Sequence, residues 1–435
     1  MTVFCHFFSK KSHLIVYQAA FFYAVRVEKN KTICYYISEV LSGRIEMGEV
    51  NEHKTSRKKS DGGKFLSMVI WAICGLLIAI LEPQINNAES AAEIIIGVWI
   101  TILAFYLALI LQVIIHESGH LVCGLISGYK FNMFRIFSFA LVKGTEKIRF
   151  KRFGLAGTSG QCLMLPPEEK NGKFPFVLYN LGGIIFNALS GVIFIAIYII
   201  FDMPPVAETC MLVLGISGIG MALQNGLPLR MGIVDNDACN TVALSKNKKA
   251  ARAFRVQLLI AGGNSDCVRL KDMPAEWFAV PEDEDMENGL VAACGALACN
   301  RLIDEHKFDE ARELITHMLE IESGMEPVYR GLLINDLIYI EAISYNRHDV
   351  IVNLYCEEQQ SKFMKAMKRS VSVMRTEYTL ALRCENNIQK AEEILKKFNK
   401  LTKNYPYLAD LQSERELMDI AAGRMPAEVA ENIEE

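Results

Sequence analysis

The chain has 435 residues, of which 51% are hydrophobic and only 22% charged, a balance too apolar for an ordinary soluble protein or a disordered one. The 46 basic and 50 acidic residues give a net charge of −4, which argues against a nucleic-acid-binding protein. The 12 cysteines are scattered along the chain without a CxxC pair, which excludes a disulfide-rich secreted scaffold. A membrane protein with a soluble part remains.

The first 64 residues are predicted to be an N-terminal segment on the cytoplasmic side. Residues 14–27 are apolar, but the stretch is short and interrupted by polar residues, so it would span a membrane poorly. A secretory signal peptide fits poorly because no small-residue cleavage site follows. We interpret residues 1–46 as either an accessory segment or an over-extended translation start, because Met47 begins a more typical basic leader.

Four later stretches have the length and apolar character of membrane-spanning helices: residues 65–81, 94–115, 176–201 and 209–224. Basic residues are concentrated before the first span, between the second and third, and after the fourth. The other two loops contain no Lys or Arg. Because basic loops are retained on the cytoplasmic side, both termini are predicted to be cytoplasmic. We expect an integral protein of the bacterial plasma membrane.

The second span runs into the sequence His116-Glu117-Ser118-Gly119-His120. Positions i and i+4 of a helix share a face, so His116 and His120 are predicted to present both imidazoles to one zinc ion. Glu117 lies beside them, where its carboxylate is placed to accept a proton from a water on that ion. The alternative is a buried, hydrogen-bonded histidine pair. Ionisable residues at the end of a long apolar span are nevertheless typical of a functional site.

A third zinc ligand is required, because catalytic zinc keeps three protein ligands and one open position. The other six histidines lie outside the strong spans, which predicts a carboxylate. Carboxylates of the outer turn are on the wrong side, and those of the basic loop are more simply explained as solvated. Asp235 and Asp237 follow the fourth span at the same end as the histidines, so the topology favours these two aspartates.

Two further polar features interrupt the apolar spans. The sequence Asn225-Gly226-Leu227-Pro228 breaks the fourth helix, because proline removes a hydrogen-bond donor and clashes with the preceding turn. Broken backbone at membrane depth lines a cavity, although a plain helix end with an Asn-Gly turn is the alternative. The third span contains Gly182, Gly183 and Asn187, which indicates either close helix packing or a position of Asn187 near a substrate.

Taken together, these motifs resemble the site-2 protease family of intramembrane zinc metalloproteases. Three elements carry the resemblance: the HExGH pattern, Gly183-x-x-x-Asn187, and Asn225-x-x-Pro228 followed by an aspartate. Their order and membrane placement also match. The similarity covers residues 65–240, which we predict to form a membrane-embedded metalloprotease core.

The resemblance implies one Zn²⁺ per chain, Glu117 as the catalytic glutamate, and three ligands, namely His116, His120 and one of the two aspartates. The family's aspartate is followed by glycine, whereas Asp235 precedes Asn236 and Asp237 precedes Ala238. Because residues 229–232 look like a short glycine-containing insertion, Asp237 is the favoured ligand and Asp235 the alternative. Asn187, Asn225 and Pro228 are candidates for holding the substrate backbone or the oxyanion.

The remaining elements are predicted from composition and periodicity. Residues 131–150 indicate a β-hairpin, which in similar family members lies beside the active site, or else an ordinary loop. Residues 241–285 are predicted to be a connector. Residues 286–435 repeat amphipathic helical offsets at an 80-residue separation and resemble a tetratricopeptide-like array, with a plain helical bundle as the alternative. We expect this cytoplasmic domain to bind a partner protein or to regulate access.

The predicted fold is therefore mainly α: a bundle of about four spans, a small β-hairpin and a cytoplasmic helical domain. The predicted function is zinc-dependent hydrolysis of peptide bonds within or next to transmembrane segments of membrane proteins or signal-peptide-like substrates. The alternative is a catalytically inactive, protease-like scaffold that binds partners through its helical tail, motivated by the altered Asp-Gly element. A soluble zincin merely anchored in the bilayer is disfavoured, because the motif is embedded in a span.

Overall fold

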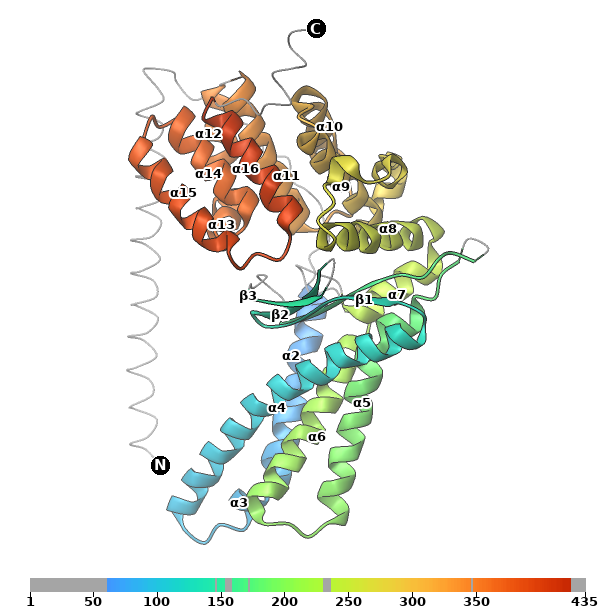
Figure 1. The fold of residues 1–435 in the computed structure, drawn as a ribbon. Coiled ribbons are helices and arrows are strands. Elements are labelled where there is room, and N and C mark those ends of the chain that lie inside the picture. Colours follow the sequence, from blue (N-terminus) through green and yellow to red (C-terminus); the bar gives the residue numbers. More distant parts are fainter. Residues whose placement is uncertain are drawn as a thin grey trace. The chain divides into compact units, whose positions relative to one another are not determined.

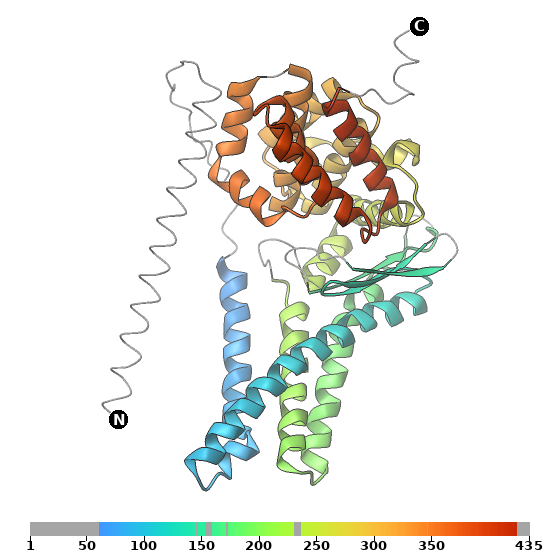
Figure 2. The same ribbon diagram turned by 60° about the vertical axis from the view of Figure 1, so that its left-hand side comes forward.

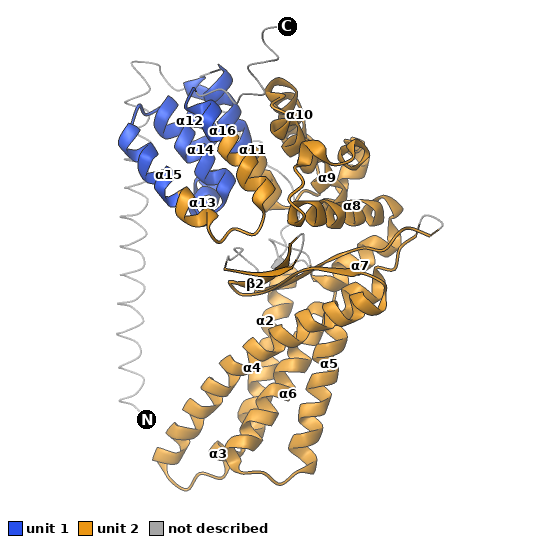
Figure 3. Cartoon of the chain, viewed as in Figure 1, with its two compact units in different colours: residues 1–53, 334–397, 417–435 blue, residues 54–333, 398–416 orange. Residues whose placement is uncertain are grey.

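A computed structural model describes residues 61–144, 147–152, 159–170, 173–229, 236–345 and 347–423. These residues are mostly helical, with one small antiparallel sheet. They fall into two compact units (Figure 3). Unit 2 contains residues 61–333 and 398–416 of the described chain, and unit 1 contains residues 334–397 and 417–423. The predicted limits at residues 64, 240 and 285 remain predictions.

Among the described residues, four helices are long and apolar enough to cross a membrane, as the sequence predicts. They are α2 (Asp61–Leu81), α4 (Ala91–Ile126), α5 (Val177–Ile200) and α6 (Pro205–Gly226), and the short helix α3 (Pro83–Asn86) joins the first two. Helix α4 extends beyond the predicted span of residues 94–115 and continues through the HESGH sequence, where the sequence already predicts His116 and His120 on one helix face. At 1.5 Å per residue its 36 residues extend for about 54 Å.

The four long helices pack through small residues and leave large apolar side chains on the outside. Helix α6 contacts α2, α4 and α5, and α4 crosses the others obliquely (Figures 1 and 2). A Cβ on Gly119 of α4 would collide with the backbone of Gly182 in α5, so these two helices meet at glycines. Trp99 and Leu103 are more than half exposed, whereas Ala108 is buried. This distribution is typical of helices surrounded by lipid.

A four-stranded antiparallel sheet follows α4 and lies across the end of the helices (Figures 1 and 2). Its strands are β1 (Lys130–Ile136), β2 (Phe139–Lys143), β3 (Ile148–Arg152) and β4 (Gly160–Leu165), in the order β3-β2-β1-β4. The expected β-element over residues 131–150 is present as β1, β2 and most of β3. Strand β4 lies beyond that range, and it pairs with β1, so the sheet is larger than the predicted hairpin.

Unit 2 continues through helices that lie after the fourth span. They are α7 (Asp237–Lys246), α8 (Lys248–Ser265), the 3-10 turns η1 (Leu270–Asp272), η2 (Ala275–Phe278) and η3 (Asp283–Glu287), α9 (Gly289–Asp304) and α10 (Phe308–Glu320). The predicted connector is therefore largely helical. A buried ion pair of 2.6 Å between Arg269 and Asp304 joins this connector to the end of α9. Glu416 accepts a second hydrogen bond from Arg269, which holds the residues 398–416 in this unit.

Unit 1 is helical. Its elements are the last part of α11 (Pro327–Ile340), the π-helical turn η4 (Glu341–Tyr345), and the helices α12 (His348–Cys356), α13 (Glu358–Ala366), α14 (Val371–Arg383), α15 (Ile388–Thr402) and α16 (Leu408–Ala421). Helices α15 and α16 are shared with unit 2. Its interior contains an ion pair of 2.6 Å between Asp336 and Arg375. The guanidinium also stacks over Tyr339, whose hydroxyl donates to the carbonyl of Leu417. The tetratricopeptide-like identity of these helices stays a prediction.

Candidate metal centre

His116 and His120 lie one turn apart on the same face of α4, within the last third of that helix. Their Nε2 atoms are 3.2 Å from each other, and both side chains are almost fully buried. An α-helix of 3.6 residues per turn produces this convergence without any help from the rest of the fold. Two imidazole nitrogens are therefore aimed at one point.

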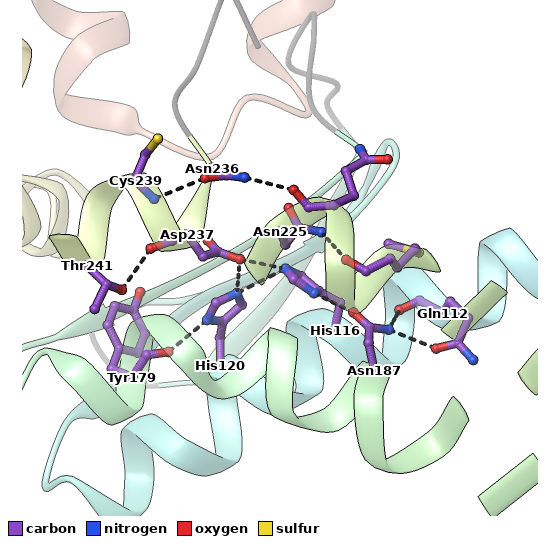
Figure 4. Close-up of polar contacts among 12 residues, drawn as sticks. Gln112, His116, His120, Tyr179, Asn187, Asn225, Asn236, Asp237, Cys239 and Thr241 are labelled. Carbon is purple, nitrogen blue, oxygen red and sulfur yellow. Dashed lines mark hydrogen bonds and ion pairs between the residues drawn. The ribbon is translucent and has the colours of Figure 1, made fainter. Parts of the chain in front are cut away.

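Asp237, the first residue of α7, brings a carboxylate to the same point. Its Oδ2 atom lies 3.0 Å from His116 Nε2 and 3.4 Å from His120 Nε2 (Figure 4). Ligand atoms about 2.0 Å from a tetrahedral zinc ion are about 3.3 Å apart, so the three atoms are spaced as one ion requires. His116, His120 and Asp237 thus form one possible metal-binding triad, and its occupation by zinc stays a prediction. Asp235, the alternative ligand, lies outside the described residues.

The charge of the Asp237 side chain also suits a metal ligand. Burial raises its pKa, but the neighbouring His120 and His116 side chains lower it more strongly. The net pKa lies below the ordinary value of an aspartate, so the group is a carboxylate at neutral pH. The histidines lower this pKa only while they are protonated; a divalent cation bound to neutral imidazoles would supply the positive charge in their place and keep Asp237 ionised.

A hydrogen-bonded amide fixes the ring of His116. Asn187 Oδ1 lies 2.6 Å from His116 Nδ1, while Asn187 Nδ2 donates to the backbone and side-chain oxygens of Gln112 at 2.9 and 2.8 Å (Figure 4). Because both amide hydrogens are directed at Gln112, the Asn187 oxygen must face His116. The ring then carries its hydrogen on Nδ1 and offers the lone pair of Nε2 to a metal.

His120 is held in the same tautomer by a different partner. Its Nδ1 atom lies 2.8 Å from the backbone oxygen of Tyr179, at the start of α5. The Tyr179 hydroxyl donates to the carbonyl of Cys162 in β4 at 2.7 Å, which joins this helix to the sheet. Both histidines therefore present Nε2 to the centre, each through a hydrogen bond from the opposite ring nitrogen.

Glu117 points toward the sheet and lies against strand β4. Its side chain is almost fully buried, and a Cβ on Gly160 would collide with its carboxylate. Any larger residue at position 160 would require the Glu117 carboxyl group to move. The fully buried guanidinium of Arg135 in β1 donates to the carbonyls of Phe137 and Gly160, at 2.7 and 3.3 Å, and so holds this part of β4 in place.

The remaining predicted residues lie around the end of α6. Asn225 Nδ2 donates to the carbonyl of Met221 in its own helix at 3.1 Å, and Pro228 is exposed in the turn that follows. Asn187 is fully buried, with its amide committed to Gln112 and His116, so its N–H groups are already used. In the structure Asn187 therefore contacts His116, one of the candidate metal ligands, and its predicted contact with substrate or oxyanion stays a prediction.

Several residues of the centre were missed by the sequence analysis: Gln112, Gly160, Tyr179 and Asn236. Asn236 caps α7 by accepting a hydrogen bond from the backbone N–H of Cys239 (Figure 4). Its side-chain amide donates to the carbonyls of Gln224 and Leu227 at 2.8 and 2.6 Å. Gln112 had a visible signal, because it is the one strongly polar residue in the apolar part of α4 before His116. Gly160 acts by lacking a side chain, Tyr179 through its backbone oxygen and Asn236 through its side-chain amide, and no motif marks any of the three.

Comparisons of the chain with protein families, curated proteins and solved structures find no match. The case for a function therefore depends on the geometry described above.

Proposed function

We propose that the protein is an intramembrane zinc metalloendopeptidase of the site-2 protease type. The observation that carries the proposal is the convergence of His116, His120 and Asp237 on one point. The two histidines and Glu117 lie on a helix long enough to span a membrane, and Asp237 begins the helix α7. Two neutral imidazoles and one carboxylate, each oriented by a further group, suit one catalytic zinc ion per chain. Bound zinc would supply a Lewis acid that activates a water molecule and polarises the scissile carbonyl.

Glu117 is the proton carrier in this proposal. Its carboxylate accepts the proton of the attacking water and then delivers it to the nitrogen of the departing peptide. Burial between α4 and β4 keeps the group away from bulk water and at a fixed position. The hydrogen bonds from Asn187 and Tyr179 keep both histidines in the tautomer that binds metal.

We further propose that the substrates are transmembrane segments or signal-peptide-like remnants. A peptide bond in an intact helix is shielded by its own side chains and hydrogen bonds, so cleavage requires local unwinding of the substrate. The basic loops support the proposal that both termini, and the metal centre with them, lie at the cytoplasmic face of a bacterial plasma membrane. The C-terminal helices would bind a partner protein there.

Zinc content and cleavage together test this function. We expect about one zinc per chain in the detergent-purified protein, lost in Asp237→Ala and retained in Glu117→Gln. Co-expression with a panel of tagged single-span membrane proteins and cleaved signal peptides should give products that Glu117→Gln reduces roughly 10²- to 10⁴-fold.

The outcomes separate the two hypotheses made from the sequence. Wild-type protein that binds no zinc when purified without chelators would contradict a metalloprotease. Zinc binding with no cleavage of any substrate in the panel, in wild type and Glu117→Gln alike, would favour the protease-like scaffold.

A further inference from the structure

The four-stranded sheet is packed on both of its faces. On one face, Phe134 of β1 packs against a buried cluster that contains Tyr179 of α5. Successive side chains of a strand point to opposite faces, so the neighbouring Met133 belongs to the other face. There Met133 is fully buried, and Tyr407 packs on it together with residues of β2. Tyr407 and the sheet are parts of unit 2, so this contact lies within one compact unit.

The contact of Tyr407 combines its ring and its hydroxyl. The hydroxyl donates a hydrogen bond of 3.4 Å to the sulfur of Met133. Burial and the Asp410 carboxylate raise the pKa of this hydroxyl more than the Arg135 guanidinium lowers it, so the hydroxyl stays protonated at neutral pH. Because sulfur is a weak acceptor, most of the contact comes from packing of the ring.

Helix α16 fixes the position of Tyr407. Tyr407 directly precedes this helix, and its carbonyl accepts a hydrogen bond from the first turn. Within the next three turns, Ser413 donates to Asp304, and Glu416 accepts from Arg269. Asp304 and Arg269 are the buried ion pair that joins the connector to α9. The start of α16 is thus attached to unit 2 at the sheet and at this ion pair.

The contacts continue from Met133 to the candidate proton carrier. Arg135 follows two positions after Met133, so it projects from the same face of β1, where it is fully buried. Its guanidinium donates to the carbonyl of Gly160 in β4 at 3.3 Å. On the other face a Cβ on Gly160 would collide with the Glu117 carboxylate, so these two residues lie directly against each other. The contacts therefore run in order through Tyr407, Met133, Arg135, Gly160 and Glu117.

Strand β4 needs support from outside the sheet. It is an edge strand that pairs with β1 alone among the described strands. Its hydrogen bonds therefore come from one side, and its place against α4 depends on what packs on β1 and β4 from either face. The helices press on one face, and Tyr407 is the side chain of the C-terminal segment that packs on the other.

We infer that Tyr407 is a positioning residue for Glu117. It holds β1 and β4 from the side opposite α4 and so keeps the backbone of Gly160 against the carboxylate. The final helix of the chain thereby takes part in the centre without touching it. The role of this contact in catalysis rests on the proposed function, whereas the holding of β4 does not.

Hydrogen exchange of the full chain in detergent tests the holding of β4. In Tyr407→Ala the amides of β4 should exchange roughly 10-fold faster than in wild type, because local opening of the strand becomes easier. Tyr407→Phe keeps the ring and should restore most of the protection. The matched control is Phe398→Ala, because Phe398 is a fully buried ring of the same segment outside the cluster around Met133. It should leave exchange of β4 unchanged.

Cleavage kinetics test the consequence for Glu117. In Tyr407→Ala, kcat should fall roughly 10- to 100-fold while KM and zinc content stay unchanged, since the proton carrier alone is displaced. Tyr407→Phe should recover most of this loss. Phe398→Ala should cleave like wild type, although it removes a more deeply buried ring. Tyr407→Leu replaces Tyr407→Ala if the latter does not fold.

Several outcomes would overturn the inference. Unchanged exchange of β4 in Tyr407→Ala would show that this side chain does not hold the strand. Faster exchange with unchanged kcat would separate the strand from Glu117, and a rise in KM alone would place Tyr407 in substrate binding. The same changes in Phe398→Ala would indicate general destabilisation. If wild type cleaves no substrate, the proposed function fails, and exchange alone then decides whether Tyr407 holds β4.

Discussion

Two side-chain amides determine which nitrogen of His116 is free for a metal. Gln112 accepts both hydrogens of the Asn187 amide, and the Asn187 oxygen then accepts from His116 Nδ1. This arrangement lies in a part of the molecule where water is scarce, so no solvent molecule replaces a missing partner. A residue in the middle of an apolar helix can thus control metal binding one turn away without touching the ion.

Replacing Asn187 with alanine should weaken zinc binding while leaving the fold intact. The ring of His116 would lose its orienting acceptor, and loss of such a group lowers metal affinity by roughly 10- to 100-fold. Competition with a fluorescent chelator measures the affinity. The control is Ser217→Ala, because Ser217 is equally buried in a span and its hydroxyl has no hydrogen-bond partner among the described residues. Equal affinities in the two variants would contradict the role of Asn187.

Gly160 gives a second prediction at the scale of a single residue. In Gly160→Ala the new methyl group would displace the Glu117 carboxylate. A displacement of about 1 Å reduces the rate of an enzyme by roughly 100-fold, so cleavage should fall while zinc content stays unchanged. Gly75→Ala is the control, since a Cβ there meets nothing within 4 Å. If Gly160→Ala cleaves like wild type, Glu117 is not held against β4 in the active protein.

At the scale of elements, helix α7 reaches the centre because its N-terminus is anchored to the end of α6. Asn236 accepts from the backbone N–H of Cys239 at 3.0 Å and donates to the carbonyls of Gln224 and Leu227. These carbonyls are available because α6 ends at Gly226, just before Pro228. The Asn-x-x-Pro sequence therefore contributes by ending a helix where the next one can attach.

Asn236→Ala should lower zinc affinity, because the ligand Asp237 would lose the anchor beside it. The matched control is Asn247→Ala, which removes the equivalent cap of the adjacent helix α8. Each cap is worth about 1 kcal/mol of stability, so both variants should lower the melting temperature similarly. Only Asn236→Ala should change the affinity for zinc. A similar loss of affinity in Asn247→Ala would show that general destabilisation explains the effect.

The elements also show which features a sequence can reveal. The four spans and the histidine pair are local features. A continuous apolar stretch such as residues 65–81 suffices to predict a span, and the HESGH pattern suffices to predict the histidine pair. Strand β4 and the cap of α7 depend on partners tens of residues away, and an apolar run such as that of β4 gives no sign of its pairing with β1. The choice of Asp237 over Asp235 was favoured by a family spacing, and only the fold brings its carboxylate to the histidines.

At the scale of the whole molecule, stability should depend on pH through Asp410. Burial, together with the Glu414 and Asp304 carboxylates, raises the pKa of Asp410 to about 7, and a hydrogen bond with Tyr405 opposes the shift. The folded state thus binds a proton that the unfolded state, with a pKa near 4, releases. The resulting stability is present at acid pH and is lost as the pH rises through about 7.

Asp410→Asn keeps the neutral form at every pH and should remove this dependence. A pKa raised by about three corresponds to about 4 kcal/mol in the free energy of unfolding. We reduce this free energy to about 2 kcal/mol because the side chain of Asp410 is partly exposed. The variant should therefore melt like wild type near pH 4 and at a higher temperature near pH 8. The control Asp266→Asn, at an exposed aspartate, should leave the melting temperature unchanged at both pH values. Parallel curves for wild type and Asp410→Asn would contradict the prediction.

The distance along the chain between the metal ligands has a consequence for biosynthesis. His116 and His120 leave the ribosome with the second span, but Asp237 follows roughly 120 residues later, after the fourth. At 5–20 residues per second the nascent chain carries an incomplete centre for roughly ten seconds. Under the proposed function, the neighbouring helices of the same chain, and of other newly inserted proteins, would not be hydrolysed during that time. Because Asp237 is synthesised last of the three candidate ligands, the proposed activity would begin only after the fourth span is made.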